Sequence, residues 1–310
     1  MKKILITGGL GFIFSHVTEH FIKGGNDVMV IDNLSAGSHP ELLPSLKQMA
    51  TECGAKLTFV EFDVSYAPVI PIITTFNPEY LIHAAAISDV DYSIKQPVKT
   101  IQSNNNATMN VFEAARKLKN LKKLLYVSTD EVYGECEHPR REEEIIFPKN
   151  PYSLSKAFGS ILRIAYDNTF QELKDKTVET RFCNVFGSRQ DDRKLIPAIK
   201  RALQGGKPLV LHNRGEGYRQ YVHVSEIPPV VAMLLEFGNR TYNVTTSEGM
   251  TVSELVHTAG VIVGKKVPIM PGNRNGMDIK YQMDGSRLFE EFGWQPSKKF
   301  EDHLKEYLLS

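Results

Sequence analysis

Short apolar segments alternate with longer amphipathic segments over the first 187 residues of the chain. Six of the short segments are apolar on both faces and rich in Val, Ile and Leu, which is typical of buried parallel strands. They cover residues 4–7, 28–32, 57–64, 80–86, 123–129 and 178–185. Because helical patterns separate these segments, the chain is predicted to form a doubly wound α/β fold around a parallel sheet.

The alternation ends after Gly187, and the remaining segments predict a smaller C-terminal α/β lobe. A strand-like segment at 209–211 precedes a polar loop at 212–219. Helix-like patterns cover residues 195–203, 224–237 and 252–263. Open α/β sheets bind ligands at their carboxyl edge, where such a lobe can hold a substrate. The expected domains are a sheet domain at 1–186, with a returning segment near 220–246, and a substrate lobe at 187–219 and 247–310.

The charge and the cysteines narrow the class of protein. The 37 basic residues nearly cancel the 36 acidic ones, so no bulk charge favours nucleic acid or an anionic membrane as a partner. Cys53, Cys136 and Cys183 are far apart, which argues against a metal site and against a disulfide framework.

The longest apolar stretch, 227–235, contains two prolines and is too short to span a bilayer. We expect a cytoplasmic protein, since the first strand starts at residue 4 and leaves no room for a signal sequence before it.

A glycine-rich turn lies between the first predicted strand and the first helix, in the segment Thr7-Gly8-Gly9-Leu10-Gly11-Phe12-Ile13. Glycines at such a turn let backbone N–H groups approach a pyrophosphate at the helix N-terminus. The second strand ends in Asp32, 24 residues after Gly8, where a carboxylate can accept hydrogen bonds from both ribose hydroxyls. The carboxylate would repel a 2′-phosphate, so the pattern favours NAD over NADP as the cofactor.

Two further positions bear on this cofactor site. The third glycine of the fingerprint is replaced by Phe14, whose ring must push the helix outward or turn into a space made for it. Asp63, near the end of the third strand, is a candidate partner for the adenine amino group.

A tyrosine and a lysine lie four residues apart at the start of a predicted helix. Tyr152 follows Asn150-Pro151, which is a helix-start signal, and Lys156 lies one turn further on. The lysine ammonium, together with a positive nicotinamide, can lower the pKa of the tyrosine and make it a general base. Thr129, at the end of the preceding strand, can hydrogen-bond the same substrate hydroxyl.

Two adjacent carboxylates, Asp130 and Glu131, follow Thr129 directly. Adjacent carboxylates on a strand-end loop can serve as a separate acid and base. Combined with the tyrosine and lysine, they predict an oxidation followed by an elimination.

These motifs resemble those of the extended short-chain dehydrogenases/reductases, and within them the NAD-dependent epimerase/dehydratase family. The chain is most similar to the dTDP-glucose 4,6-dehydratases. The resemblance covers nearly the whole length: the glycine turn, 83–86, 103–104, 128–134, 150–156, 181–187, 194–197, 219–221, 242–244, 274–281 and 292–296. It implies a Rossmann domain that binds NAD and a lobe that binds a nucleotide sugar.

The resemblance also implies a reaction, in which an NDP-hexose of the dTDP-glucose or UDP-glucose type becomes an NDP-4-keto-6-deoxyhexose. Tyr152 would remove the 4-hydroxyl proton while hydride passes from C4 to NAD. Glu131 would then remove the C5 proton, and Asp130 would help the 6-hydroxyl leave as water. Hydride returns to C6, so the net redox change is zero.

The resemblance assigns the binding residues as well, and it implies a homodimer formed through the helices that contain residues 104–118 and 152–170. The cofactor-binding residues would be Gly8, Gly11, Phe12, Ile13, Asp32, Asn33, Asp63, Val64, Ala84, Ala85, Ala86, Asn104 and Lys156. The substrate-binding residues would be Ser88, Asn184, Lys194, Arg219 and Arg274.

Several other activities remain open from the sequence. The dTDP-glucose enzymes usually carry Glu, His and Arg where this chain has Ile87, Asp89 and Tyr92, so the hexose is open. A nucleotide-sugar C4-epimerase would use the same tyrosine and lysine but needs no carboxylate pair. A UDP-glucuronate decarboxylase generally has Ser in place of Asp130. A catalytically inactive NAD-binding sensor is suggested only by Phe14.

Overall fold

The computed structural model describes residues 1–272 and 280–310. The chain divides into two compact units, which are described separately. The first unit comprises Met1–Val132, Pro148–Arg181 and Ile227–Tyr242, and the second comprises Tyr133–Phe147, Phe182–Glu226 and Asn243–Ser310. The domain boundaries expected from the sequence stay a prediction.

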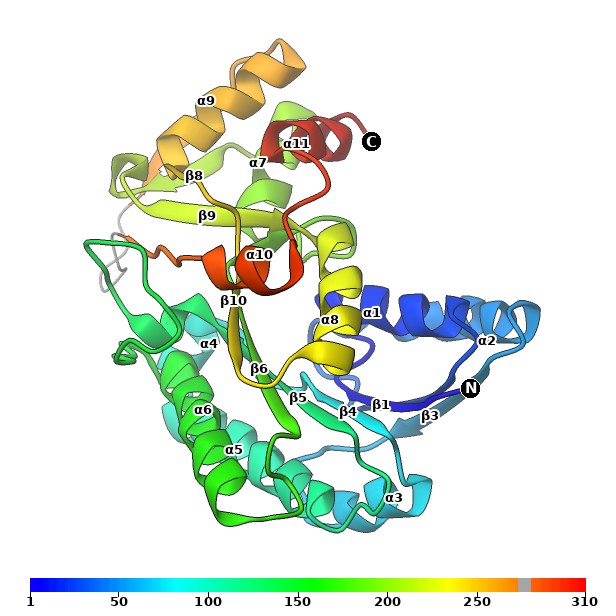
Figure 1. Cartoon of the computed structure of the whole chain (residues 1–310). Helices are drawn as coiled ribbons and strands as arrows, with labels where there is room; N and C mark the ends of the chain where they lie inside the picture. Colours follow the sequence, from blue (N-terminus) through cyan, green and yellow to red (C-terminus); the bar gives the residue numbers. More distant parts are fainter. Residues whose placement is uncertain (273–279) are drawn as a thin grey trace. The chain divides into compact units, whose positions relative to one another are not determined.

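The first unit is built on a seven-stranded sheet with strand order β10-β6-β5-β4-β1-β2-β3. The strands from β5 to β3 pair in parallel. They are β1 Lys3–Thr7, β2 Asp27–Asp32, β3 Lys56–Glu61, β4 Tyr80–His83, β5 Lys123–Thr129, β6 Thr177–Phe182 and β10 Thr241–Val244. The sequence of strands and the crossing helices confirm the predicted doubly wound Rossmann fold (Figure 1).

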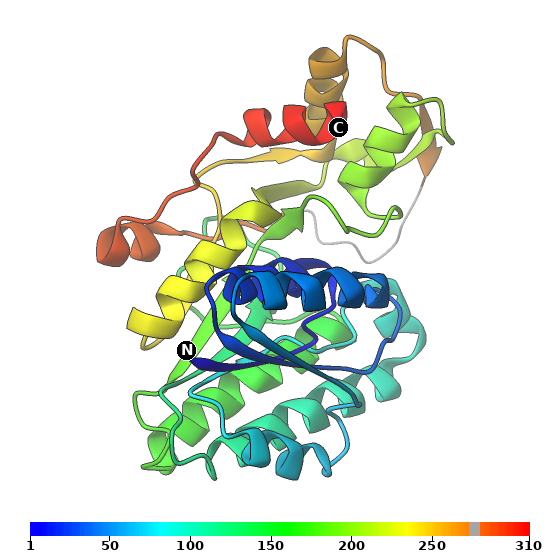
Figure 2. The same ribbon diagram turned by 90° about the vertical axis from the view of Figure 1, so that its right-hand side faces the viewer.

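Helices cover both faces of this sheet. Figure 2 shows α1 and α2, in dark and mid blue, on one face and α3, α5 and α6, in cyan to green, on the other. The helices of this unit are α1 Phe12–Lys23, α2 Leu43–Glu52, α3 Val69–Phe76, α4 Val90–Lys95, α5 Pro97–Ala115, α6 Pro151–Thr169 and α8 Ile227–Phe237, with 3-10 turns η1 Pro40–Leu42 and η2 Asp130–Tyr133. Strand residues Leu81 and Leu124 pack against Val111 and Phe112 of α5 in one fully buried cluster. Each such side chain contributes about 1.5–3 kcal/mol by burial, which fixes the helices on the sheet.

The second unit contains a three-stranded sheet, β11-β9-β7, and a two-stranded sheet, β12-β8. Its strands are β7 Asn184–Phe186, β8 Leu209–His212, β9 Tyr218–His223, β11 Gly249–Thr251 and β12 Ile269–Gly272. Its helices are α7 Leu195–Leu203, α9 Val252–Val263, α10 Ser286–Phe292 and α11 Phe300–Leu309, with 3-10 turns η3 Asn213–Gly215 and η4 Val224–Glu226. Phe186, Ile199, Leu255 and Leu304 bring these elements together in a core of their own.

The structure differs from the sequence predictions at several element ends. The apolar run 178–185, predicted as one strand, is two strands, because the chain leaves β6 after Phe182 and its next segment pairs with β9 in another sheet. The predicted C-terminal bound of the loop 212–219 was wrong, because β9 begins at Tyr218 and pairs with β11.

The predicted helix 224–237 begins as the 3-10 turn η4, and regular α-helix starts only at Ile227. Pro228 and Pro229 lie in that first turn, where proline disfavours helical geometry in the residues before it. Two predicted strands are also too long, since β3 ends at Glu61 and β4 ends at His83.

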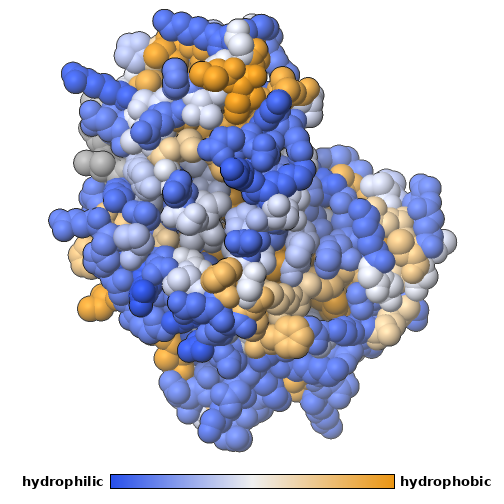
Figure 3. All heavy atoms as spheres, turned by 45° about the horizontal axis from the view of Figure 1, so that its top comes forward, coloured by the Kyte–Doolittle hydropathy of each residue, from blue (hydrophilic) through white to orange (hydrophobic). Residues whose placement is uncertain are grey.

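Within the ranges 1–272 and 280–310, no helix combines the length and the apolar composition needed to cross a bilayer. The face in Figure 3 is largely hydrophilic, with separate apolar patches.

Candidate active site

The glycine turn after β1 packs tightly against the segment that follows β4. The N–H group of Gly8 donates to the Ile31 carbonyl at 2.8 Å, and that of Gly11 donates to the Gly8 carbonyl at 3.1 Å. Gly8 has a φ of 72°, in the left-handed region that favours glycine. A Cβ at this position would lie 2.8 Å from the backbone of Ala85. The close approach of these two segments therefore requires glycine at position 8.

We expect Gly8→Ala to weaken NAD binding at least about tenfold, equivalent to about 1.4 kcal/mol, because the added methyl group must displace the turn. Gly54→Ala is the matched control, since Gly54 has a φ of 64° but open space around a built Cβ. Both variants pay about 1–2 kcal/mol for a left-handed alanine. Calorimetric NAD titration and thermal unfolding separate the two effects, and equal NAD affinities would contradict the role of the turn.

Helix α1 begins directly after this turn. It starts at Phe12, its N-cap residue Gly11 has no side chain to cap it, and its first turn contains no acidic residue. The N–H groups and the positive end of the helix dipole there fit a pyrophosphate. Phe14 is 5% exposed, and the Ser15 N–H still donates to the Gly11 carbonyl at 2.9 Å. The ring is accommodated by burial, and the first turn of the helix is intact.

Asp32 lies at the end of β2 and is 5% exposed. One carboxylate oxygen accepts from the Leu10 N–H at 3.1 Å, and the other accepts from the Leu34 N–H at 3.0 Å and the Ser38 hydroxyl at 2.7 Å. The carboxylate therefore joins the glycine turn to the loop after β2. Its contact with a ribose stays a prediction.

Asn33 and Asp63 meet beyond the ends of β2 and β3, because the Asn33 amide donates to the Asp63 carboxylate at 3.1 Å. Burial raises the pKa of Asp63, but hydrogen bonds from Ser65 and Asn33 outweigh it and lower the pKa overall. An ionised Asp63 suits the predicted adenine contact. Val64, the next residue, is buried in the core.

The segment after β4 is held by side chains from α5 and from β1. The N–H groups of Ala84 and Ala85 donate to the Thr7 hydroxyl at 3.2 and 3.3 Å. The amide oxygen of Asn104 accepts from the Ile87 N–H. Its amide nitrogen donates to the Ile87 carbonyl and to the Ser155 hydroxyl, the latter at 2.9 Å. Asn104 thus links α5, α6 and this segment. A direct contact of Asn104 or of Ala84 to Ala86 with the cofactor stays a prediction.

The carboxylate pair lies immediately after β5. The Thr129 hydroxyl donates to the Asp130 carboxylate at 3.0 Å and accepts from the Glu131 N–H at 3.3 Å. Thr129 and Asp130 are buried, whereas Glu131 is half-buried. Thr129 ends β5, and Asp130 and Glu131 begin the 3-10 turn η2. The backbones of all three residues therefore lie in regular structure.

Tyr152 and Lys156 lie in the first two turns of α6, and both are buried, with exposures of 9% and 4%. The Lys156 ammonium donates to the Val127 carbonyl of β5 at 2.7 Å. It also lies 5.2 Å from the centre of the Tyr126 ring, as a cation–π contact. The lysine is therefore anchored to the same strand that carries Thr129.

Burial lowers the pKa of Lys156 to about 8, and the nearby Glu179 carboxylate opposes this shift. Burial also raises the pKa of Tyr152, with further increases from Glu131 and Asp130 and an opposing hydrogen bond from Thr129. The lowering of the tyrosine pKa expected from Lys156 together with a positive nicotinamide stays a prediction. Burial of the phenol is the largest cause of the raised pKa and the two carboxylates add to it, so the positive charge of an oxidised nicotinamide would favour deprotonation of Tyr152.

The predicted phosphate-binding residues lie mostly in the second unit. Asn184 on β7 and Arg219 on β9 are on neighbouring strands, with Asn184 opposite Tyr221. The Arg219 guanidinium lies 4.4 Å from the Tyr281 ring centre. Lys194 is exposed and precedes α7. These residues could bind phosphates of a substrate, which stays a prediction.

Two other predicted substrate residues lie elsewhere. Ser88 is exposed in the segment after β4 of the first unit. Arg274 lies outside the described residues.

Sequence reasoning missed two features of the first unit. The Asn150 amide donates to the Glu131 carboxylate at 2.8 Å, although Asn150 was predicted only as a helix start. Glu179 of β6 is fully buried between Arg181, at 2.8 Å, and Arg163, at 3.4 Å. The signal for the second feature was present, because charged residues in a buried strand must be paired.

The chain matches known proteins over almost its full length. The model of a family described as GDP-mannose 4,6 dehydratase matches residues 5–307. The chain belongs to this family. The predicted membership of the extended short-chain dehydrogenases/reductases, in the NAD-dependent epimerase/dehydratase group, is thereby confirmed.

Individual proteins match the chain over a similar length. The dTDP-glucose 4,6-dehydratase of Salmonella typhimurium is 30% identical over 98% of this chain and 91% of that protein. A dTDP-glucose 4,6-dehydratase of Streptomyces venezuelae, solved with NAD bound, has a TM-score of 0.88 at 27% identity, covering 99% of this chain and 96% of that one. The UDP-glucose 4-epimerase of Thermotoga maritima, solved with UDP-glucose, has the same TM-score of 0.88 at 29% identity, covering 99% and 97%. This dehydratase and this epimerase are thus equally similar to the chain in backbone.

Proposed function

We propose that this family member is an NAD-dependent nucleotide-sugar 4,6-dehydratase, a lyase that removes water from an NDP-hexose. The observation that carries the proposal is that the amide of Asn150, two residues before Tyr152, donates to the Glu131 carboxylate at 2.8 Å, while the Thr129 hydroxyl donates to the adjacent Asp130 carboxylate at 3.0 Å. A tyrosine base and two carboxylates in one place supply the three proton transfers that oxidation and elimination require. Similarity to dTDP-glucose 4,6-dehydratases supports the same reaction.

In this proposal each side chain has one task. Tyr152 removes the proton from the sugar 4-hydroxyl, Glu131 removes the C5 proton once C4 is a ketone, and Asp130 protonates the departing 6-hydroxyl. Bound NAD would supply the hydride acceptor for C4 and the hydride donor for C6, and the proton taken up by Glu131 would return to C5 as the hydride is delivered. The start of α1 directly after the glycine turn, the close approach at Gly8 and the buried Asp32 support NAD as the cofactor.

The test is incubation of the purified protein with dTDP-glucose, UDP-glucose and UDP-N-acetylglucosamine, followed by mass spectrometry. We expect the loss of one water from at least one of these nucleotide sugars. Protein that binds NAD but dehydrates none of them would contradict the proposal.

A C4-epimerase is the second candidate, because the UDP-glucose 4-epimerase of Thermotoga maritima matches the backbone equally well. The same incubation distinguishes the two, since an epimerase leaves the mass unchanged and NMR spectra show a new C4 configuration. The carboxylate pair favours the dehydratase, because epimerisation at C4 breaks no bond at C5 or C6.

The substrate diphosphate is proposed to contact Asn184, Lys194, Arg219 and Arg274, since amide and cationic donors are what two phosphates require. The identity of the sugar is left open, because Asp89 stands where related enzymes usually have His. The Asp89 carboxylate accepts the Tyr92 N–H at 2.9 Å and caps α4. A carboxylate used as a helix cap has less freedom to bind a sugar hydroxyl.

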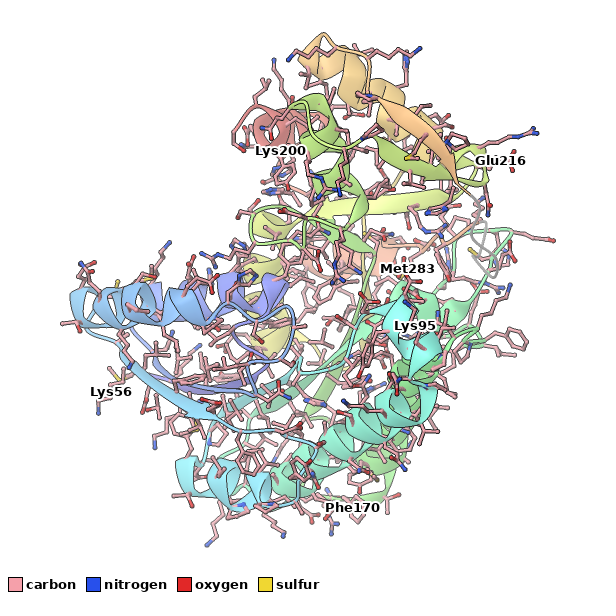
Figure 4. The ribbon with its side chains drawn as sticks, turned by 180° about the vertical axis from the view of Figure 1, so that it is seen from behind. Lys56, Lys95, Phe170, Lys200, Glu216 and Met283 are labelled. Carbon is pink, nitrogen blue, oxygen red and sulfur yellow. The ribbon has the colours of Figure 1, made fainter. Side chains whose placement is uncertain are left out.

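We also propose a homodimer formed through α5 and α6. Figure 4 shows these helices side by side, with Lys95 labelled near one end of the pair and Phe170 near the other. Their exposed apolar side chains are Val98, Met109, Leu154, Ile161 and Ile164. Apolar side chains gathered on one pair of helices are typical of a protein interface.

We expect Ile161→Glu to weaken this dimer at least about 100-fold, or about 2.7 kcal/mol, because a symmetric interface would bury the new charge twice. Ile161 is 59% exposed, so the monomer itself should remain folded. Val261→Glu, on α9 and 67% exposed, is the matched control. Sedimentation velocity over a concentration series measures both, and an undiminished dimer in the first variant would place the interface elsewhere.

A further inference from the structure

The side chain of Asn150 connects the start of α6 to the carboxylate of Glu131. Its amide oxygen accepts from the Ser153 N–H at 2.8 Å, as an N-cap, and its amide nitrogen donates to the Glu131 carboxylate at 2.8 Å. Because an N–H group requires an acceptor, the oxygen must face Ser153 and the nitrogen must face Glu131. The direction of the amide is thus determined by the hydrogen bonds at both of its ends.

The backbone of Asn150 is equally fixed. Pro151 follows it and restricts it to extended geometry, and Asn150 has φ −138° and ψ 164°. Its N–H donates to the Ser153 hydroxyl at 3.1 Å, which completes a capping box. The Leu154 N–H donates to its carbonyl at 2.9 Å. The amide therefore cannot move away from Glu131 without breaking the first turn of α6.

Glu131 comes from η2, and its own backbone N–H is held by the Thr129 hydroxyl at 3.3 Å. The second anchor, Asn150, lies two residues before Tyr152 on the helix that carries the tyrosine. We propose that Asn150 is a positioning residue, which holds the Glu131 carboxylate at a fixed place relative to Tyr152 and favours its ionised form for proton removal. The inference rests on the proposed function, in which Glu131 is the base at C5.

Three variants separate this role from simple capping of the helix. Asn150→Ser keeps a good N-cap oxygen but removes the amide donor. Asn150→Asp keeps the cap and places a second carboxylate beside Glu131. Thr251→Ala is the matched control, because Thr251 forms the equivalent capping box on α9 with Glu254. Thermal unfolding of Thr251→Ala measures the cost of losing a cap, and the two Asn150 variants should lose less stability than it does.

The first readout needs no substrate. The carboxyl carbon of Glu131, labelled with ¹³C and assigned by comparison with Glu131→Gln, is titrated by NMR. We expect its pKa to rise by about one unit in Asn150→Ser, since a hydrogen bond to an ionised group is lost. We expect a larger rise in Asn150→Asp, because two like charges oppose each other. An unchanged Glu131 titration in both variants would overturn the inference, whatever the protein acts on.

The second readout uses the nucleotide sugar that the wild-type protein dehydrates. Exchange of the C5 hydrogen with solvent deuterium should slow about tenfold in Asn150→Ser, while C4 oxidation stays within about twofold. The pH profile of exchange should move to higher pH in Asn150→Asp, and that of Thr251→Ala should not move. If the wild-type protein dehydrates nothing, the proposed function fails, but the NMR titration still tests Asn150. If it dehydrates and both variants match it in both readouts, the Asn150 inference fails alone.

Discussion

Replacement of Glu131 by Gln is expected to slow water elimination about a thousandfold and to leave C4 oxidation largely intact. Gln has the same size and its amide oxygen can still accept the Asn150 hydrogen bond, but it cannot take a proton from C5. The variant should therefore stop at the 4-keto sugar. In a single turnover, reduced nicotinamide should accumulate by absorbance while mass spectrometry detects no dehydrated product.

Glu137→Gln is a suitable control for this experiment, because Glu137 is an exposed carboxylate in the same stretch of sequence. It should eliminate water at the wild-type rate. Normal turnover in the Glu131 variant would remove that residue from the role of base.

Replacement of Tyr152 by Phe should reduce C4 oxidation about a thousandfold, since the phenol is the proposed acceptor of the 4-hydroxyl proton. The ring is 9% exposed and Phe fills nearly the same volume, so the variant should fold with little loss of stability. Rapid-mixing absorbance of reduced nicotinamide measures the oxidation step, and thermal unfolding checks the fold.

The matched control is Tyr166→Phe on the same helix, where the lost hydroxyl donates to Glu113 at 2.7 Å. This variant should oxidise its substrate normally. Oxidation at the wild-type rate in Tyr152→Phe would show that another group accepts the proton.

Local signals in the sequence predicted some elements at their true bounds. Strand β5 and helix α9 coincide with their predictions, 123–129 and 252–263. In α9 the reason is visible, since Thr251 and Glu254 form a capping box that marks the helix start. Interactions of this kind span a single helical turn and can be read from neighbouring residues.

Pairings between distant residues could not be predicted in this way. The break at Cys183 arises because Asn184 pairs with Tyr221, which belongs to another sheet, and no local pattern records that choice. The first two residues of β9, Tyr218 and Arg219, were predicted as loop because the strand is stabilised by β7 and β11 on either side.

The candidate site shows the same division. Motif spacing identified Tyr152, Lys156 and the carboxylate pair, which lie within two short segments. The contact of Asn150 with Glu131 joins those segments across 19 residues and needed the fold to be seen. The raised pKa of Tyr152 likewise depends on burial and on the distance to both carboxylates.

The buried carboxylate of Glu179, between Arg163 and Arg181, restricts how the sequence of this protein can diverge. Loss of one member of a buried ion pair leaves an uncompensated charge and costs about 3–5 kcal/mol, a large part of the stability of an ordinary domain. A lineage that replaces Glu179 first must therefore pass through a poorly folded ancestor. Among related sequences, the residues at these three positions should therefore covary.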